Sequence, residues 1–154
     1  RHKTWVHEGG IATPLIVHWP GGIAARGALR RTPGHVVDLV PTILARCGGS
    51  PPATAMAPPR PGRDLSPAFA DDCVVARESL WWSHDGHRAL RVGDLKWVVA
   101  RGEPAQLFDL AVDRAEAHDL AAAQPQRVRA MAAEWQAQED AFRAALPERR
   151  VRRP

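Results

Sequence analysis

The pattern of apolar and polar positions divides the chain into two parts. The first part contains residues 14–20, a short apolar run bounded by Pro14 and Pro20. Such a run is typical of a buried strand whose ends cannot extend a hydrogen-bonded ladder. Val36 and Val37 predict a second short strand. Because strands buried on both faces need neighbours, we expect this part to lie beside a larger sheet.

A helix is predicted directly after these two strands. Asp38 is well placed as its N-cap, and Pro41 is tolerated in its first turn. The apolar stripe at helical spacing comprises Leu39, Val40, Ile43, Leu44 and Cys47. Gly48-Gly49 supplies a C-cap. We expect Cys47, at the end of this helix, to be a small buried apolar residue.

The second part alternates polar and apolar residues from Glu78 onward. Four strands are predicted, over residues 79–84, 87–92, 95–99 and 106–110. Asp85-Gly86 and Gly93-Asp94 are the turn signals between the first three. A small antiparallel sheet needs a cover on one face, and the helix that Pro125 opens is expected to supply it. The apolar side of that helix comprises Val128, Met131, Trp135 and Phe142.

Two segments are predicted to lack regular structure. Residues 50–63 are rich in proline, alanine and glycine and show no periodicity, which predicts a linker and a subdomain boundary. The last residues contain much of the formal net charge of +4, through Arg149, Arg150, Arg152 and Arg153. We expect a solvated, disordered basic tail there.

Composition narrows the classes of partner. The length suits one core or two small subdomains. No apolar run approaches membrane-spanning length, and no basic face is interleaved with aromatic residues. We therefore expect neither a membrane nor a nucleic acid as a partner. The two cysteines, Cys47 and Cys73, form neither a disulfide framework nor a metal-knuckle spacing, so the compartment stays open between cytoplasmic and periplasmic or secreted.

Residue types alone offer little chemistry. Lys3 reads as a solvated lysine, His7 as an ordinary polar residue, and Glu8-Gly9-Gly10 as a turn whose glycines allow positive φ. The seven histidines form no His-Glu-x-x-His pattern and no tight cluster with cysteine, which argues against a transition-metal site. The carboxylates of Asp113 and Glu116 are interpreted as solvated turn groups rather than as a catalytic pair.

An ordered series of motifs along the chain is more informative than the residue types alone. It begins with Lys3, five residues before Glu8-Gly9-Gly10, and continues with residues 14–23, PLIVHWPGGI. The later members are His35 to Gly48, Gly62-Arg63-Asp64-Leu65, Leu95-Lys96-Trp97, Leu107-Phe108-Asp109-Leu110 and Asp113-x-x-Glu116-x-x-Asp119-Leu120. Each match is weak, but their order and spacing together are specific. The series resembles the C-terminal portion of formylglycine-dependent arylsulfatases.

The resemblance implies an α/β fold. It places the end of the large mixed sheet of an alkaline-phosphatase-like sulfatase domain in residues 1–49, and a Pro/Ala-rich loop or linker in residues 50–77. A four-stranded antiparallel subdomain with one covering helix is expected over residues 78–146, followed by the basic tail at residues 147–154.

The resemblance also implies a reaction. Such enzymes hydrolyse sulfate esters with a formylglycine nucleophile, while calcium polarises the sulfate oxygens. Lys3 matches a lysine that contacts the sulfate, and His7 is a candidate for the substrate pocket. The nucleophile and the calcium ligands are expected upstream of this chain, so the isolated chain is expected to bind neither cofactor and to be inactive. The implied partner of the whole enzyme is a small-molecule sulfate ester.

Some residues depart from the family pattern. Cys73-Val74-Val75-Ala76-Arg77 has the spacing of a formylglycine motif, but Val75 replaces the required proline or alanine and the segment follows Lys3. We interpret that match as coincidence. Arg114 stands where proline is usual, and His118 where asparagine is common. Two alternatives stay open: a related phosphonate or phosphate monoester hydrolase, and a non-catalytic interaction module.

Overall fold

The protein folds into two compact units. The structure, a computed structural model, describes residues 2–49 and 62–145. Among these residues, one unit, here the sheet unit, joins residues 2–14 to residues 78–145, and the other, the helical unit, comprises residues 15–49 and 62–77. The predicted organisation groups residues 1–14 with residues 15–49, whereas in the structure they pack with the sheet. The predicted tail at 147–154 and residues 50–61 of the predicted linker lie outside the described residues.

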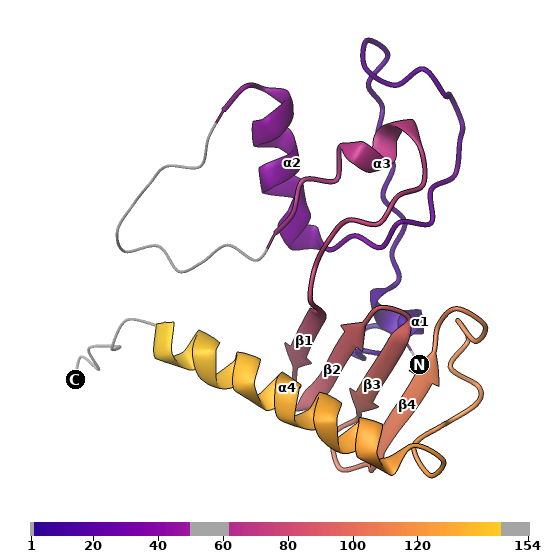
Figure 1. The fold of residues 1–154 in the computed structure, drawn as a ribbon, viewed down its shortest axis with the longest axis vertical. Coiled ribbons are helices and arrows are strands. Elements are labelled where there is room, and N and C mark those ends of the chain that lie inside the picture. The colour runs from indigo at the N-terminus through magenta and orange to yellow at the C-terminus, as the bar shows by residue number, and fades with distance from the viewer. Residues whose placement is uncertain (1, 50–61, 146–154) are drawn as a thin grey trace. The chain divides into compact units, whose positions relative to one another are not determined.

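The sheet unit contains a four-stranded antiparallel sheet in the order β1-β2-β3-β4 (Figure 1). Its strands are β1 (Leu80–His84), β2 (His87–Val92), β3 (Leu95–Val99) and β4 (Ala105–Asp109). The strands predicted from the alternation are thus confirmed. His84 pairs with His87, so Asp85 and Gly86 alone make the first turn, with φ of 51° and 80°. Positive φ at both central residues matches the right-handed twist of a tight hairpin.

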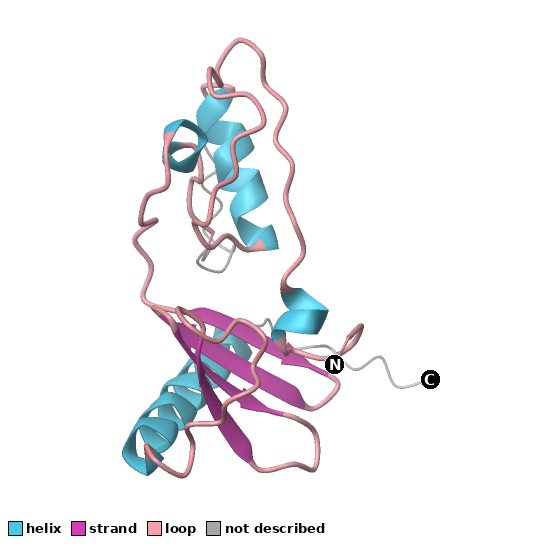
Figure 2. Cartoon of the chain, turned by 90° about the vertical axis from the view of Figure 1, so that its right-hand side faces the viewer, coloured by secondary structure: helices cyan, strands magenta, loops and turns pink. Residues whose placement is uncertain are grey.

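Helix α4 (Pro125–Ala145) covers one face of this sheet, as the sequence predicts (Figure 2). The core between them comprises Leu90, Trp97, Leu107, Met131 and Trp135. The rings of Trp81 and Trp135 stack with centroids 5.3 Å apart. Trp135 Nε1 donates to the carbonyl of Trp82 at 2.9 Å, and Trp81 Nε1 donates to the carbonyl of Trp135 at 3.2 Å. These bonds fix the helix because a buried indole N–H needs a partner.

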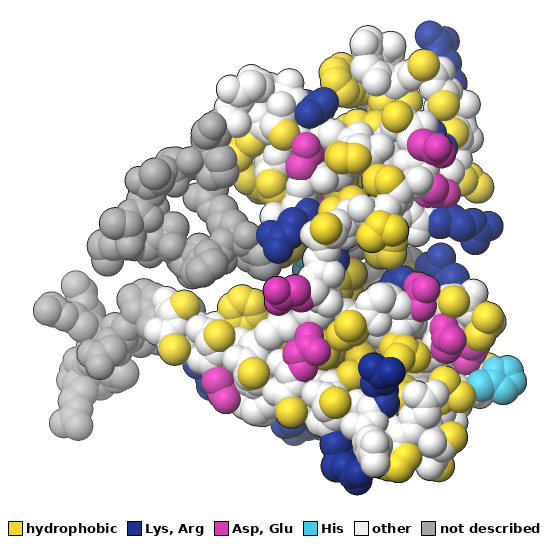
Figure 3. All heavy atoms as spheres, viewed as in Figure 1, with side chains coloured by type: hydrophobic (Ala, Val, Ile, Leu, Met, Phe, Trp, Pro, Cys, Tyr) yellow, Lys and Arg dark blue, Asp and Glu magenta, His cyan; other side chains and the backbone are white. Residues whose placement is uncertain are grey.

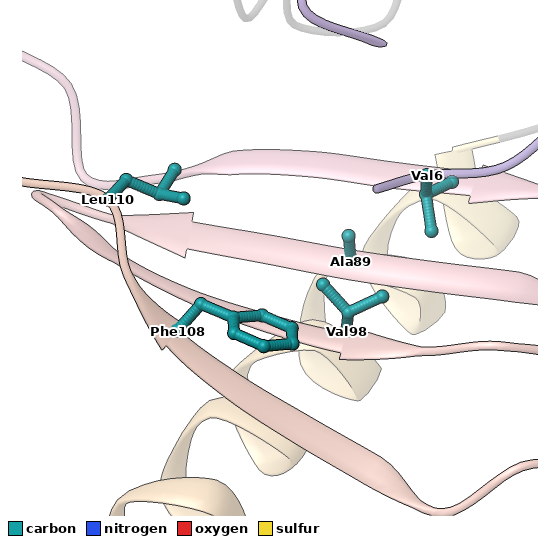
Figure 4. Packing of buried hydrophobic residues seen from close by; sticks show 5 residues of the cluster. All are labelled: Val6, Ala89, Val98, Phe108 and Leu110. Carbon is teal, nitrogen blue, oxygen red and sulfur yellow. The ribbon is translucent and has the colours of Figure 1, made fainter. Parts of the chain in front are cut away.

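The N-terminal residues cover the opposite face of the sheet. Val6 is 2% exposed and packs with Ala89, Val98, Phe108 and Leu110 (Figure 4). A short helix, α1 (Glu8–Ile11), follows directly. The sheet is therefore covered on both faces, and the second cover comes from about 80 residues earlier in the chain, a separation at which periodicity carries no signal.

The helical unit contains η1 (Val36–Asp38), α2 (Leu39–Arg46) and α3 (Pro67–Ala70). The strands predicted at residues 14–20 and 36–37 are not formed. A strand needs a pairing partner, and the described residues of this unit contain none. At Val36, two local hydrogen bonds favour a turn over a strand. Asp38 Oδ2 accepts from His35 N at 2.7 Å, and His35 Nδ1 accepts from Val37 N at 3.3 Å. This capping box closes a 3₁₀ turn.

Asp38 organises the helical unit. Its carboxylate is fully buried, accepts from Arg63 N at 2.8 Å and pairs with Arg77 Nη2 at 2.7 Å. Thr42 Oγ1 donates to the carbonyl of Asp38 at 2.6 Å and accepts from Leu65 N at 2.9 Å. Asp38 stands before α2 as predicted, but its carboxylate makes no bond to the amides of that helix. It binds the amide of Arg63 and the guanidinium of Arg77 instead.

Much of the apolar surface of the helical unit is exposed. Cys47 is exposed rather than buried as expected, because it lies at the C-cap beyond the last residue of α2. Leu39 and Leu44 of the predicted stripe are half-buried. Further exposed apolar side chains are Leu15, Ile16, Leu29, Val40 and Ile43. Apolar side chains are accordingly frequent on the surface that Figure 3 shows. The predicted C-cap holds: Gly48 has φ of 67°, the left-handed conformation that ends helices.

Candidate functional site

Lys3 lies on an exposed turn at the start of the sheet unit. Its φ is 41° and that of Thr4 is 22°, and Trp5 N donates to the carbonyl of Lys3. Left-handed backbone at a residue other than glycine costs about 1–3 kcal/mol. The turn therefore depends on the contacts that hold the residues immediately after it.

Those contacts begin at Trp5. Its ring lies 4.4 Å from the ring of His87, measured between centroids. His7 is 6% exposed, and its Nε2 lies 3.4 Å from Oε1 of Gln106 on β4. The two residues singled out in the sequence thus differ in environment. Lys3 faces solvent, while His7 is packed against the sheet and helps to hold the segment.

Glu8, the residue after His7, belongs to a buried ionic network with Lys96 and Glu116. Lys96 Nζ is 2.8 Å from Oε1 of Glu8 and 2.8 Å from Oε1 of Glu116. The three side chains are 0%, 12% and 5% exposed, respectively. Arg114 Nη2 lies 3.7 Å from Oε2 of Glu8. The buried Lys96 and the largely exposed Arg114 thus face two carboxylates, and such pairing offsets part of the cost of burying charge. The ammonium also lies 5.9 Å from the ring centroid of Trp82.

Glu116 also binds the backbone of α1. Its Oε2 accepts from Glu8 N at 2.8 Å, so one carboxylate contacts both the charge partner and the first amide of the short helix. Glu116 itself has φ of 54°. Its loop is held by Asp113, whose carboxylate accepts from the amides of Ala117 and His118. These backbone hydrogen bonds lower the pKa of Asp113.

The Glu-Gly-Gly turn does not have the positive φ that the sequence predicts at its glycines. Gly9 and Gly10 are not among the glycines with positive φ. A Cβ on Gly10 would lie 2.1 Å from the carbonyl oxygen of Trp5, so glycine is required there for close backbone approach. Gly10 N also donates to the carbonyl of His7 at 2.8 Å. The turn brings the chain after Glu8 back against the residues that follow Lys3.

Sequence reasoning missed the partnership of Glu8 with Lys96 and Glu116. It treated Glu116 as a solvated turn residue, and Lys96 only as part of a motif. One signal was present: Lys96 stands between Leu95 and Trp97 in an apolar strand. A lysine inside such a strand is almost never buried without a charge partner.

Other site types find little support in the described part of the chain. Within it, no group of three or more His, Cys, Asp or Glu side chains is arranged to hold a metal ion. Across the same residues, no helix combines the length and apolarity needed to cross a membrane. A hollow of about 100 Å³ is lined by Val92, Leu95, Arg127, Ala130, Met131 and Glu134. It lies against α4, on the face of the sheet opposite Val6.

Comparison with known proteins finds sulfatases. No family model matches the chain. N-acetylgalactosamine-6-sulfatase of Rattus norvegicus is 31% identical over 94 residues, and that of Canis lupus familiaris is 32% identical over 94 residues. Each match covers 61% of this chain and 17% of the relative, so the chain spans about a sixth of the relatives' length. The predicted resemblance to the C-terminal portion of the sulfatase family is confirmed.

Solved structures share the fold. The crystal structure of Ps i-CgsB matches with a TM-score of 0.59 and 20% identity, over 86% of this chain and 33% of that one. The structure of BT4656 in complex with its substrate D-glucosamine-2-N,6-O-disulfate matches with a TM-score of 0.50 and 15% identity. That match covers 73% of this chain and 25% of BT4656. At such identities the likeness concerns the fold alone.

Proposed function

We propose that this chain is the C-terminal part of a sulfate ester hydrolase in which Lys3 contacts the sulfate group. The observation that carries the proposal is the placement of Lys3, exposed on a turn while the residues from Val6 to Glu8 are held in the sheet unit. An ammonium presented in this way is a compact point charge suited to an anionic oxygen. The sulfatase relatives supply the reaction class.

The chemical role of Lys3 follows from charge. When the ester bond breaks, negative charge grows on the leaving oxygen and on the sulfate oxygens. A fixed cation beside them stabilises the transition state more than the ground state. Lys3 thus acts by position and charge, and no proton transfer is required of it.

Calcium and formylglycine do not fit the described residues. No carboxylate cluster there is arranged for a metal. Cys73 is bound at its backbone to Thr32 within the helical unit and lies in an incomplete motif. We therefore assign both groups to sequence outside this chain, where calcium would polarise the sulfate and formylglycine would supply the nucleophile.

The proposal is tested by comparing substrates. The protein that contains this chain should turn over 4-nitrophenyl sulfate in preference to 4-nitrophenyl phosphate and to a phosphonate monoester. Sulfated amino sugars belong in the same panel, because D-glucosamine-2-N,6-O-disulfate is given as the substrate of BT4656 and the mammalian relatives are N-acetylgalactosamine-6-sulfatases. The purified 154-residue chain should show no turnover. A preference for the phosphate or phosphonate would favour the related hydrolase, and turnover by the isolated chain would contradict the assignment of the nucleophile to other sequence.

A further inference from the structure

We propose that Lys96 and Glu116 are positioning residues for the reaction, and that they set the location of Lys3 by holding Glu8. The inference rests on the proposed function. It assigns a positioning role to two residues of the C-terminal sheet and loop, which are 0% and 5% exposed.

The first argument is the character of the contact. Lys96 Nζ is 2.8 Å from both carboxylates, and Glu116 Oε2 also accepts from Glu8 N at 2.8 Å. Buried ion pairs add little net stability relative to apolar side chains of the same volume. What they provide is direction, because each bond fixes an angle as well as a distance. Two of these contacts are hydrogen bonds to Glu8, from Lys96 Nζ to its carboxylate and from its own amide to Glu116 Oε2. Together they fix both the side chain and the backbone of Glu8, while the ion pair of Lys96 with Glu116 holds the two partners together.

The second argument is the short path from Glu8 to Lys3. Val6 is buried between the two, in the cluster with Ala89 and Val98. The close approach of Gly10 to the carbonyl of Trp5 holds the same stretch from the other side. With both ends of residues 5–8 fixed, the left-handed turn at Lys3 has few alternatives. A shift of about 1 Å at a reacting group is enough to lower rates by roughly 10²-fold.

The third argument is that the network is separate from the main core. Leu90, Trp97 and Leu107 pack with α4 on the opposite face of the sheet. Lys96 pairs with Phe108 and Arg91 across the strands, and its side chain lies on the face of Val98 by alternation. Loss of the network is therefore expected to release residues 2–14 while β2, β3 and α4 stay folded.

The experiment uses the protein that contains this chain. Lys96→Met removes the cation. A triple variant, Lys96→Met/Glu8→Gln/Glu116→Gln, removes all three charges and leaves no unpaired buried carboxylate if the single variant fails to fold. Arg91→Met is the matched control: it removes a cation from the strand position paired with Lys96, and Arg91 bonds to Asp94 and Gly93 rather than to Glu8.

Two readouts separate positioning from stability. Amide exchange of residues 2–14 should accelerate about tenfold or more in both network variants, while residues 87–99 change by less than about twofold. On 4-nitrophenyl sulfate, kcat should fall roughly 10–10²-fold with KM nearly unchanged, because the lost interaction acts in the transition state. Arg91→Met should leave both readouts near wild type.

The outcomes distinguish the two proposals. Absence of sulfate ester turnover by the wild-type protein overturns the proposed function, and with it the catalytic role inferred here. An active wild type whose network variants keep normal exchange at residues 2–14 overturns the positioning inference alone. So does accelerated exchange that leaves kcat unchanged.

Discussion

Lys96 Nζ and Oε1 of Glu8 lie 2.8 Å apart although 88 positions separate the two residues in the chain. The contact joins the segment that bears Lys3 to the third strand of the sheet. It also gives the Glu-Gly-Gly motif and the Leu-Lys-Trp motif one shared structural purpose, so the two motifs are best understood as a pair.

Lys3→Ala in the protein that contains this chain should lower kcat/KM for an aryl sulfate by roughly 10²–10³-fold, the range for loss of one preorganised charge or donor. Lys3→Arg should also be impaired, because a guanidinium fork cannot occupy the place of the ammonium without moving the sulfate. Steady-state kinetics of both variants on one aryl sulfate provide the measurement. A loss below about threefold in Lys3→Ala would remove Lys3 from the site.

Hydrogen exchange of the 154-residue chain should differ along its length. Residues 12–35 form no helix or strand in the structure, so their amides should exchange fast. The amides of β2, β3 and α4 are bonded in the sheet and the covering helix and should exchange slowly. Exchange followed by mass spectrometry at peptide resolution tests this. Equal protection of both regions would contradict the contrast.

Trp135→Ala should destabilise the sheet unit by about 3–5 kcal/mol, because a buried aromatic side chain is lost and a cavity remains. The carbonyl of Trp82 also loses its donor. Phe142→Ala is the control on the same helix: its side chain is 39% exposed, so the loss should be clearly smaller. Urea unfolding followed by near-UV circular dichroism compares the two.

Asp38→Asn should destabilise the helical unit by about 3–5 kcal/mol, since it leaves the guanidinium of Arg77 without its charge partner. The fully buried carboxylate also binds the amide of Arg63. Exchange of the α2 amides reports the loss. Asp71→Asn, at an exposed position of the same unit, should change stability by less than about 0.5 kcal/mol. Equal effects of the two variants would argue against a special role for Asp38.

The helical unit should lose stability between neutral and mildly acidic pH. Burial lowers the pKa of His35, with Asp38 opposing this shift and Arg77 adding to it. The folded state therefore favours neutral His35, so its contribution is complete above the ordinary value of about 6.5. It is lost as the pH falls through the lowered pKa of the folded state. Protonation at Nδ1 would also remove the acceptor for Val37 N.

Exchange of the amides from Val36 to Arg46 at pH 7.5 and 5.0, corrected for intrinsic rates, measures the effect of His35. His35→Asn keeps an acceptor for the amide of Val37 without a titrating group, and its pH dependence should be flatter. The same pH dependence in both proteins would assign the loss to other groups.

Local signals in the sequence predicted most of the sheet unit. Asp85-Gly86 forms a two-residue turn, and Pro125 begins α4, because turn and cap chemistry acts within a few residues of its signal. The prediction of a strand at Val36 was wrong. Two β-branched residues suggested a strand, but the reciprocal bonds of His35 and Asp38 made a 3₁₀ turn instead. Side-chain bonds to nearby amides compete with strand pairing.

Long-range contacts of the candidate site could not be predicted in this way. Glu8 meets Glu116 across 108 positions, and no periodic pattern encodes a partner at that distance. Glu116 looked like a solvated group because it and Asp113 form a pair of carboxylates in a predicted loop. Its burial results from a left-handed turn that aims the carboxylate at Lys96. Glu8, Lys96 and Glu116 each lie in one of the motifs, but only the fold shows that they are partners.

The cover that residues 6–11 place over the sheet sets an order of events during synthesis. These residues leave the ribosome before the strands that they cover, and Glu8 has no complete binding place until Glu116 has been made, 108 residues later. At about 5–20 residues per second, that delay is roughly 5–20 s. Contacts between such distant residues form late because the intervening loop must first close. The segment that bears Lys3 thus cannot take its final position until the C-terminal strands and Glu116 have been made. A chain released before residue 116 would lack the contacts that fix the position of Lys3.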